Sequence, residues 1–139
     1  IAHDCLVGDN VIMSNLSTLG GHVKIGNWAI LGGGVLVHQF TQIGEHSLIG
    51  GGFRAVQDVP PFILAANHPL KYKGVNIVGL KRRGFSKQDM DLIKQAYKIF
   101  FRSGANRKKA MERIESELPK TKVIQNILEF INHSNRGII

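Results

Sequence analysis

The chain has little cysteine, few aromatic residues and no long apolar run. Its single cysteine, Cys5, excludes an intrachain disulfide and a cysteine-based metal site, and it is consistent with a reducing compartment. No apolar stretch of about 18 residues and no signal peptide is found, so we expect a cytoplasmic protein without membrane insertion. Aromatic residues make up 7% of the chain and do not alternate with the basic ones, which argues against nucleic-acid binding.

Charge is distributed unevenly along the chain. Residues 1–69 carry 2 basic and 4 acidic residues, whereas residues 70–139 carry the other 16 basic residues against 6 acidic ones. The net charges of the two parts are therefore −2 and +10, and their sum is the stated +8. A surface of positive sign attracts acidic partners. Phosphorylated small molecules and an acidic carrier protein both fit this charge.

An aliphatic residue recurs every six positions in the first part of the chain. The residues are Ile1, Val7, Met13, Leu19, Ile25, Leu31, Val37, Ile43 and Ile49. A small or β-branched residue lies two positions before most of them, and the two positions share one face of a strand. A period of six fits neither an α-helix nor an open strand and is typical of a short-repeat β-solenoid. Three such repeats close one coil of about 18 residues, with neighbouring coils about 4.8 Å apart.

Glycine follows the aliphatic residue in most repeats, at positions 8, 20, 26, 32, 44 and 50. We expect these glycines at the corners, because glycine adopts dihedral angles that other residues avoid and lets stacked backbones approach closely. The first residue, Ile1, is already in phase with the repeat and the chain lacks a starting Met. We therefore expect a piece of a longer chain with further coils upstream.

The repeat ends at Pro60 and Pro61, and three parts are expected. They are a β-helix over 1–60, an ordered loop over 61–85 and a small helical domain over 86–139. Within the last part, Ser86 is placed as the N-cap of a first helix that Gly104 closes. Two more helices are expected, one between Asn106 and Pro119 and one from about residue 121 to near residue 133.

Histidines gather on one edge of the predicted coil. With three repeats per coil, His3, Gly21 and Gln39 stack in one column, and His22 and His38 flank it. Histidine is the natural general base at neutral pH, and a glycine amide can stabilise a developing oxyanion.

Two further observations bear on this edge. Asp4 can orient His3 as in a hydrolase triad, provided that both residues lie at a corner. Zinc held by three imidazoles is the rival use of the edge. No two histidines here are five residues apart, which is the spacing in hexapeptide carbonic anhydrases, so we expect no metal.

Several short runs carry a family resemblance. They are Ile1-Ala2-His3-Asp4-Cys5, Leu19-Gly20-Gly21-His22-Val23, Val37-His38-Gln39-Phe40, Val56-Gln57-Asp58-Val59-Pro60-Pro61, Gly74-Val75-Asn76-Ile77, Gly79-Leu80-Lys81-Arg82-Arg83-Gly84-Phe85-Ser86 and Arg102-Ser103-Gly104. In these runs, which extend over nearly the whole chain, the sequence resembles the UDP-N-acetylglucosamine acyltransferases of lipid A biosynthesis. The hexad alone indicates only a superfamily, and the segment 79–86 makes the resemblance specific.

The resemblance implies a left-handed parallel β-helix followed by a small α-helical domain, and a homotrimer with active sites between subunits. It implies transfer of an (R)-3-hydroxyacyl group from acyl carrier protein to the glucosamine 3-hydroxyl of UDP-N-acetylglucosamine, the first step of lipid A biosynthesis, without a cofactor. Other hexapeptide-repeat proteins are alternatives: a related N-acyltransferase, a CoA-dependent acetyltransferase or a non-enzymatic β-helix scaffold.

The resemblance also implies roles for individual residues. His3 is the general base, Asp4 supports it and the Gly21 amide is the oxyanion donor. The implied substrate contacts are His22, His38, Gln39, Gly51, Asn76, Arg82 and Arg83. Of these, Gly51 matches a position in the acyl-chain groove of the family. Asn76 and Arg82 match nucleotide-side contacts, and Arg83 is adjacent to them. Val78 stands where the family has a glutamate.

Overall fold

The computed structural model describes residues 1–139, which form two compact units. The first, here the coil unit, comprises Ile1–Asn76 and His133–Ile139. The second, the helical unit, comprises Ile77–Asn132. Each unit is described by itself.

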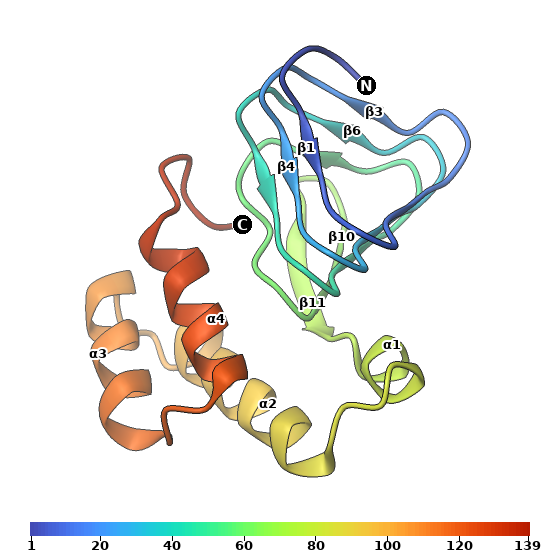
Figure 1. The fold of residues 1–139 in the computed structure, drawn as a ribbon. Helices are drawn as coiled ribbons and strands as arrows, with labels where there is room; N and C mark the ends of the chain where they lie inside the picture. The colour runs from blue at the N-terminus through green and yellow to red at the C-terminus, as the bar shows by residue number, and fades with distance from the viewer. The chain divides into compact units, whose positions relative to one another are not determined.

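The coils of the coil unit are built from two-residue strands (Figure 1), and there are nine of them. They are β1 Leu6–Val7, β2 Ile12–Met13, β3 Thr18–Leu19, β4 Lys24–Ile25, β5 Ile30–Leu31, β6 Leu36–Val37, β7 Gln42–Ile43, β8 Leu48–Ile49 and β9 Arg54–Ala55. They stack into three parallel faces: face 1 is β1-β4-β7, face 2 contains β2-β5-β8, and face 3 is β3-β6-β9. Leu6 lies opposite Lys24 and Lys24 opposite Gln42, so each coil consists of three repeats. The predicted left-handed parallel β-helix with helices after it is confirmed.

The inside of the coils is filled as the six-residue period predicts. From the second coil on, the large aliphatic positions are at most 4% exposed: Leu19, Ile25, Leu31, Val37, Ile43 and Ile49. The compact partners Val23, Ala29 and Val35 are fully buried. Each large side chain contributes about 1.5–3 kcal/mol by leaving water, so this column holds the coils together. Ile1 and Val7, in the first coil, are exposed because no coil of this chain lies over them.

The corner glycines act differently from the expectation. A left-handed φ recurs every six residues, at Asp4, Asn10, Leu16, His22, Trp28, Gly34, Phe40, His46 and Gly52. The glycines that follow the strands do not have it, so the dihedral explanation was wrong for them. Their second expected role holds, since a Cβ on Gly20 would lie 2.7 Å from the backbone nitrogen of Gln39. These positions need glycine because the next coil passes so close.

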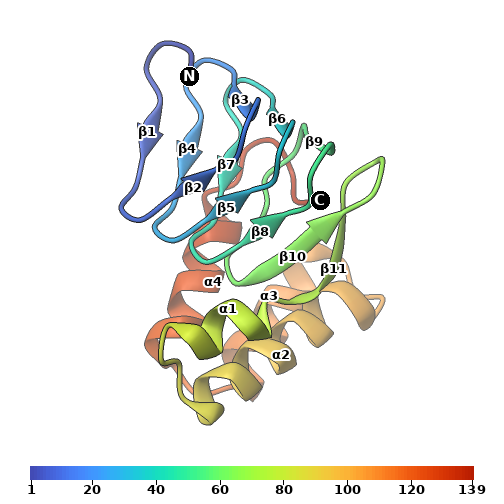
Figure 2. The same ribbon diagram turned by 90° about the vertical axis from the view of Figure 1, so that its right-hand side faces the viewer.

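Residues 61–85 are more regular than the expected loop. Strands β10 (Ile63–Ala66) and β11 (Lys71–Val75) form an antiparallel hairpin, and β10 extends face 2 by pairing with β8 (Figure 2). Leu64 lies opposite Leu48, where an unbroken repeat would place Ala66. The chain therefore continues the stack out of phase, which removed the periodic signal from the sequence. Helix α1 (Ile77–Arg82) follows and belongs to the helical unit.

The helical unit contains three longer helices, α2 (Lys87–Arg102), α3 (Arg107–Glu117) and α4 (Lys122–Asn132). The Ser86 hydroxyl accepts the Asp89 amide at 3.0 Å, and the Asn106 side chain accepts the Lys109 amide at 2.9 Å. Ser86 was predicted as an N-cap and Asn106 as the start of the second helix, and both side chains satisfy amides that the first turn of a helix leaves free. None of the helices has the length and apolar character needed to cross a membrane.

The C-terminal residues close the end of the coil unit. Asp58 is 1% exposed, and its carboxylate accepts the Gln42 amide at 2.7 Å and the Ser134 hydroxyl. Its backbone amide donates to Gly137 at 2.9 Å and its carbonyl accepts the Ile139 amide at 3.1 Å. A buried carboxylate is stable when hydrogen bonds replace its hydration, and here those bonds fasten residues 133–139 to the last coil.

Candidate active site on one edge of the coil

The edge between face 3 and face 1, here the His3 edge, is formed by the corner residues 3–4, 21–22 and 39–40. Nδ1 of His3 lies 2.9 Å from Oδ2 of Asp4, at the corner that such a pairing requires. The left-handed backbone of Asp4, φ 57°, turns its side chain to the same side as that of its neighbour. A carboxylate only accepts hydrogen bonds, so this contact assigns the proton of a neutral imidazole to Nδ1, and in that tautomer Nε2 has the free lone pair.

Gly21 lies against the unprotonated side of His3. A Cβ on Gly21 would be 2.8 Å from both Cε1 and Nε2 of the imidazole, so a larger residue would displace the ring. The backbone N–H of Gly21 donates to no group of the chain. A residue with a free backbone amide therefore packs against the imidazole of His3, and a free amide and a basic nitrogen are the two groups needed for attack on a carbonyl group.

His22 occupies the next corner position and completes a small cluster. Its Nε2 lies 3.8 Å from Oδ2 of Asp4, and its ring meets His3 edge-on with centroids 5.1 Å apart. On its other side the ring stacks on Phe40, with centroids 4.8 Å apart and planes 7° apart. Phe40 was missed as a site residue, although its spacing of one coil from His22 was available. The stacking fixes the imidazole of His22 in place.

His38 and Gln39 open onto a neighbouring surface. They line a groove of about 290 Å³ on face 3, together with Leu36, Arg54 and Val56 among others. The groove is lined by polar side chains and by exposed apolar ones, since Leu36 and Val56 are 46% and 44% exposed. Arg54 was not expected here, although it lies one coil beyond Leu36 in the same outward row.

The remaining predicted residues of the coil unit lie on other edges. Gly51 is at the corner between face 2 and face 3, where a Cβ would lie 3.2 Å from the carbonyl oxygen of Gly33. Asn76 is 3% exposed, and its Nδ2 donates to the backbone oxygen of His46 at 3.0 Å, at the edge between face 1 and face 2. The coil unit of one chain thus brings His3, Asp4 and Gly21 together but not Gly51 or Asn76.

Arg82 is the last residue of α1 in the helical unit, and Arg83 follows it in a turn. Burial, and secondly the charge of Arg82, lowers the pKa of Arg83 below its ordinary value. The guanidinium group of Arg83 nevertheless remains protonated near neutral pH, because arginine titrates far above it. Two adjacent positive forks are suited to a diphosphate. Val78, 63% exposed on the same helix, offers no acceptor in place of the glutamate of the family.

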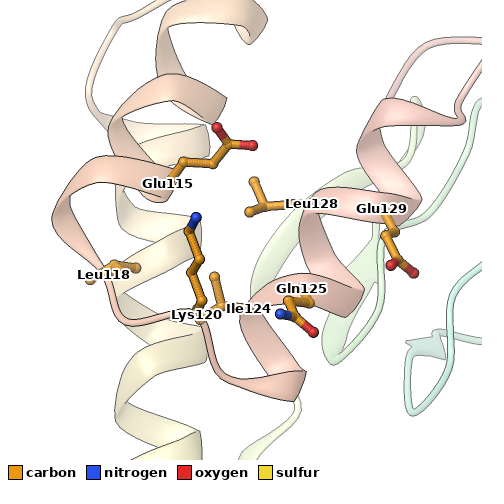
Figure 3. A pocket seen from close by; sticks show the side chains of 7 residues that line it. All are labelled: Glu115, Leu118, Lys120, Ile124, Gln125, Leu128 and Glu129. Carbon is orange, nitrogen blue, oxygen red and sulfur yellow. The ribbon is translucent and has the colours of Figure 1, made fainter.

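The helical unit also contains a hollow between α3 and α4 (Figure 3). Its volume is about 410 Å³, and Leu118, Ile124 and Leu128 are among the residues that line it. The charged residues at this hollow, Glu115, Lys120 and Glu129, are of mixed sign. This arrangement has neither a nucleophile nor a general base with an orienting partner, so the chemistry is better placed at the His3 edge.

Comparison with known proteins gives consistent matches. Residues 58–139 match the model of domain 2 of the UDP-N-acetylglucosamine O-acyltransferase family. The acyl-[acyl-carrier-protein]–UDP-N-acetylglucosamine O-acyltransferase of Aliivibrio salmonicida is 48% identical over 139 residues, which are 100% of this chain and 53% of that protein. The chain thus spans about half the length of the curated relatives it matches.

Solved structures agree with the sequence matches. The UDP-N-acetylglucosamine acyltransferase of Bacteroides fragilis superposes with a TM-score of 0.97 at 42% identity, over 100% of this chain and 55% of that one. PerB from Caulobacter crescentus, solved with CoA and GDP-perosamine, covers 52% of this chain and 35% of its own, with a TM-score of 0.51 and 38% identity. The likeness to PerB is thus partial, whereas the Aliivibrio salmonicida and Bacteroides fragilis proteins match this chain over its whole length. The chain belongs to the UDP-N-acetylglucosamine O-acyltransferase family.

Proposed function

We propose that the protein transfers an (R)-3-hydroxyacyl group from acyl carrier protein to the glucosamine 3-hydroxyl of UDP-N-acetylglucosamine, as the first step of lipid A biosynthesis in the cytoplasm. The relatives' names give the acyl carrier and the nucleotide sugar. One observation carries the proposal: the His3 imidazole, held by Asp4, presents Nε2 beside the free amide of Gly21.

The chemistry follows from that arrangement. Nε2 of His3 takes the proton of the sugar hydroxyl while its oxygen attacks the thioester carbonyl. The Gly21 amide stabilises the negative oxygen that forms, and Asp4 stabilises the imidazolium. When the C–S bond breaks, the thiolate leaves and takes the proton back from His3. Atoms and charges balance without a cofactor.

We propose that the site is completed in a homotrimer. His3, Gly51 and Asn76 lie on three different edges of the coil unit, so they reach one substrate only if different copies supply them. The outward row of face 2 supports association, because Ile12, Ile30 and Leu48 lie opposite one another on it and Ile12 is 53% exposed. An exposed apolar row of this kind marks an interaction surface.

Mixing two inactive variants tests the shared site. His3→Ala removes the proposed base, and Arg82→Ala removes an exposed nucleotide contact from the helical unit. If one site takes these residues from neighbouring copies, co-refolding both variants restores part of the activity, because some interfaces keep both residues. Mixtures as inactive as the separate variants would place each site within one chain. Light scattering on the same samples measures whether trimers form.

The charge of the chain supports the proposed donor and nucleotide sugar. The +10 region, residues 70–139, attracts an acidic carrier protein by steering, which salt weakens. The Arg82–Arg83 pair together with Asn76 is proposed to hold the nucleotide, and His22, His38 and Gln39 the rest of the substrate. Equal use of acyl-CoA without a salt effect would favour the alternative of a CoA-dependent acetyltransferase.

Removal of the base tests the proposed function directly. His3→Ala should lower turnover by about 10²–10⁴-fold, the usual effect of losing a general base. The His3 side chain is 73% exposed, so the fold should be retained. His68→Ala is the matched control, because His68 is also exposed and lies outside the coil repeat. A His3→Ala enzyme that keeps more than a third of the wild-type rate refutes the assignment of the base.

A further inference from the structure

The cluster of His3, Asp4 and His22 contains the ligand types that zinc prefers. One ligand atom from each residue lies within 4.8 Å of the other two. Zinc binds imidazole nitrogen and carboxylate oxygen at about 2.0–2.2 Å, which places the ligands of a tetrahedral site about 3.4 Å apart. Oδ2 of Asp4 lies 2.9 Å from Nδ1 of His3 and 3.8 Å from Nε2 of His22. One distance is shorter than about 3.4 Å and the other is longer.

The backbone holds these side chains close together before any ion binds. Asp4 and His22 both have left-handed φ values, 57° and 59°, at equivalent corners of successive coils. The His22 amide donates to the His3 carbonyl at 3.0 Å, which fixes one corner over the other. Stacking on Phe40 fixes the ring of His22 further. A chelating site formed in advance binds an ion at low entropic cost.

We propose that this cluster binds one divalent transition-metal ion, with zinc as the representative, in a site of three protein ligands and one exchangeable water. The side chains of His3, Asp4 and His22 are 73%, 66% and 43% exposed, so the fourth coordination position faces solvent. Three protein ligands and an open position are the usual composition of a zinc site that is not purely structural.

The consequence for catalysis rests on the proposed function. A bound ion takes the Asp4 carboxylate that orients His3 and binds Nδ1 of the imidazole, the nitrogen that faces this carboxylate at 2.9 Å. The proton of the neutral ring then moves from Nδ1 to Nε2, so the base loses both its orienting partner and the lone pair that accepts the hydroxyl proton. Zinc should therefore inhibit acyl transfer reversibly, and a chelator should restore it. The same three residues cannot serve as base and as metal site at one time, which makes the ion an inhibitor and not a cofactor.

Calorimetric titration of the protein with zinc chloride tests the site independently of activity. We expect one ion per chain, and His22→Gln or Asp4→Asn should weaken binding at least about tenfold, since loss of even a second-shell partner costs 10–100-fold. His68→Ala should bind as the wild type does. Cobalt(II) should give the absorption bands of a tetrahedral ion in the wild type but not in His22→Gln.

The outcomes separate the site from the function. Absence of binding at millimolar zinc, or equal binding by the wild type, His22→Gln and Asp4→Asn, overturns the metal site. A His3→Ala enzyme with nearly full activity overturns the proposed function instead and leaves the calorimetric result as it is. Zinc that binds with the expected variant pattern but does not inhibit transfer refutes only the competition between the ion and the base.

Discussion

Gly20 and Gly21 are neighbours for which the structure predicts opposite effects of the same substitution. A Cβ on Gly21 would lie 2.8 Å from the imidazole of His3, a side chain that is 73% exposed and can turn away. A Cβ on Gly20 would lie 2.7 Å from the backbone nitrogen and 3.0 Å from the Cα of Gln39. That backbone belongs to the next coil, and it cannot move without separating the coils.

Gly21→Ala should therefore keep the fold and lose the reaction. Neither glycine has a left-handed φ, so alanine meets no backbone strain at either position. At Gly21, where the neighbouring side chain can move, alanine should raise the free energy of unfolding by about 0.4–1 kcal/mol, because it lowers the entropy of the unfolded chain. The displaced imidazole no longer points Nε2 at the hydroxyl, and a misplacement of about 1 Å costs on the order of 10²-fold in rate. Gly20→Ala should instead lose about 1–3 kcal/mol of stability, the usual cost of overpacking.

Two measurements on both variants decide the matter. Denaturant unfolding followed by circular dichroism gives the free energy of unfolding of each variant. Steady-state transfer from acyl carrier protein to UDP-N-acetylglucosamine gives the rate, measured on an active enzyme that carries the same substitution. Gly21→Ala with the wild-type rate would show that His3 is not placed by the bare glycine. Equal destabilisation of the two variants would refute the distinction between a movable side chain and a fixed backbone.

Three further predictions follow from the same structure. Asp58→Ala should lower the free energy of unfolding by about 1–3 kcal/mol, because it leaves the half-buried backbone amide of Gln42 and the buried Ser134 hydroxyl without their acceptor; unfolding curves check this, and earlier proteolysis of residues 133–139 should accompany it. Gly51→Met should shift the donor preference toward shorter hydroxyacyl chains, at about 0.8 kcal/mol for each methylene excluded; a donor panel with unchanged relative rates would show that Gly51 does not measure the chain. The Michaelis constant for acyl carrier protein should rise with ionic strength, as steady-state assays at several salt concentrations will show.

The coils and the helices could be predicted because each leaves a local signal. Each flat side of a coil uses six residues, so the side chains that face inward recur every six positions and indicated the β-helix. Three sides make a coil of 18 residues, which aligned His3 with Gly21. The helices began where Ser86 and Asn106 offered side-chain acceptors to free amides. Such signals depend only on residues close in sequence, and no long-range contact is needed to read them.

The parts that were missed depend on contacts that leave no local signal. Strand β10 pairs with β8 through Leu64, and not Ala66, opposite Leu48, so the hairpin continues the sheet without continuing the period. In the sequence, Phe40 resembles any other aromatic residue. Only the stacking of successive coils places its ring against the imidazole of His22. The left-handed corner residues are of many types, including Asp4 and Trp28, because corner hydrogen bonds between coils impose the conformation that the side chain alone disfavours.

The length of one coil, three repeats, also explains why one coil unit brings together only part of the proposed site. Residues separated by a whole number of coils share an edge, as His3 and Gly21 do. Gly51 is separated from them by whole coils plus two repeats, so it lies on another edge. His46, whose carbonyl holds Asn76, falls on the third. No adjustment of side chains within the coil can change this, because the register is fixed by the strand pairing. A β-helix therefore lets a base be built from a single chain, while a site that uses all three edges requires its neighbours.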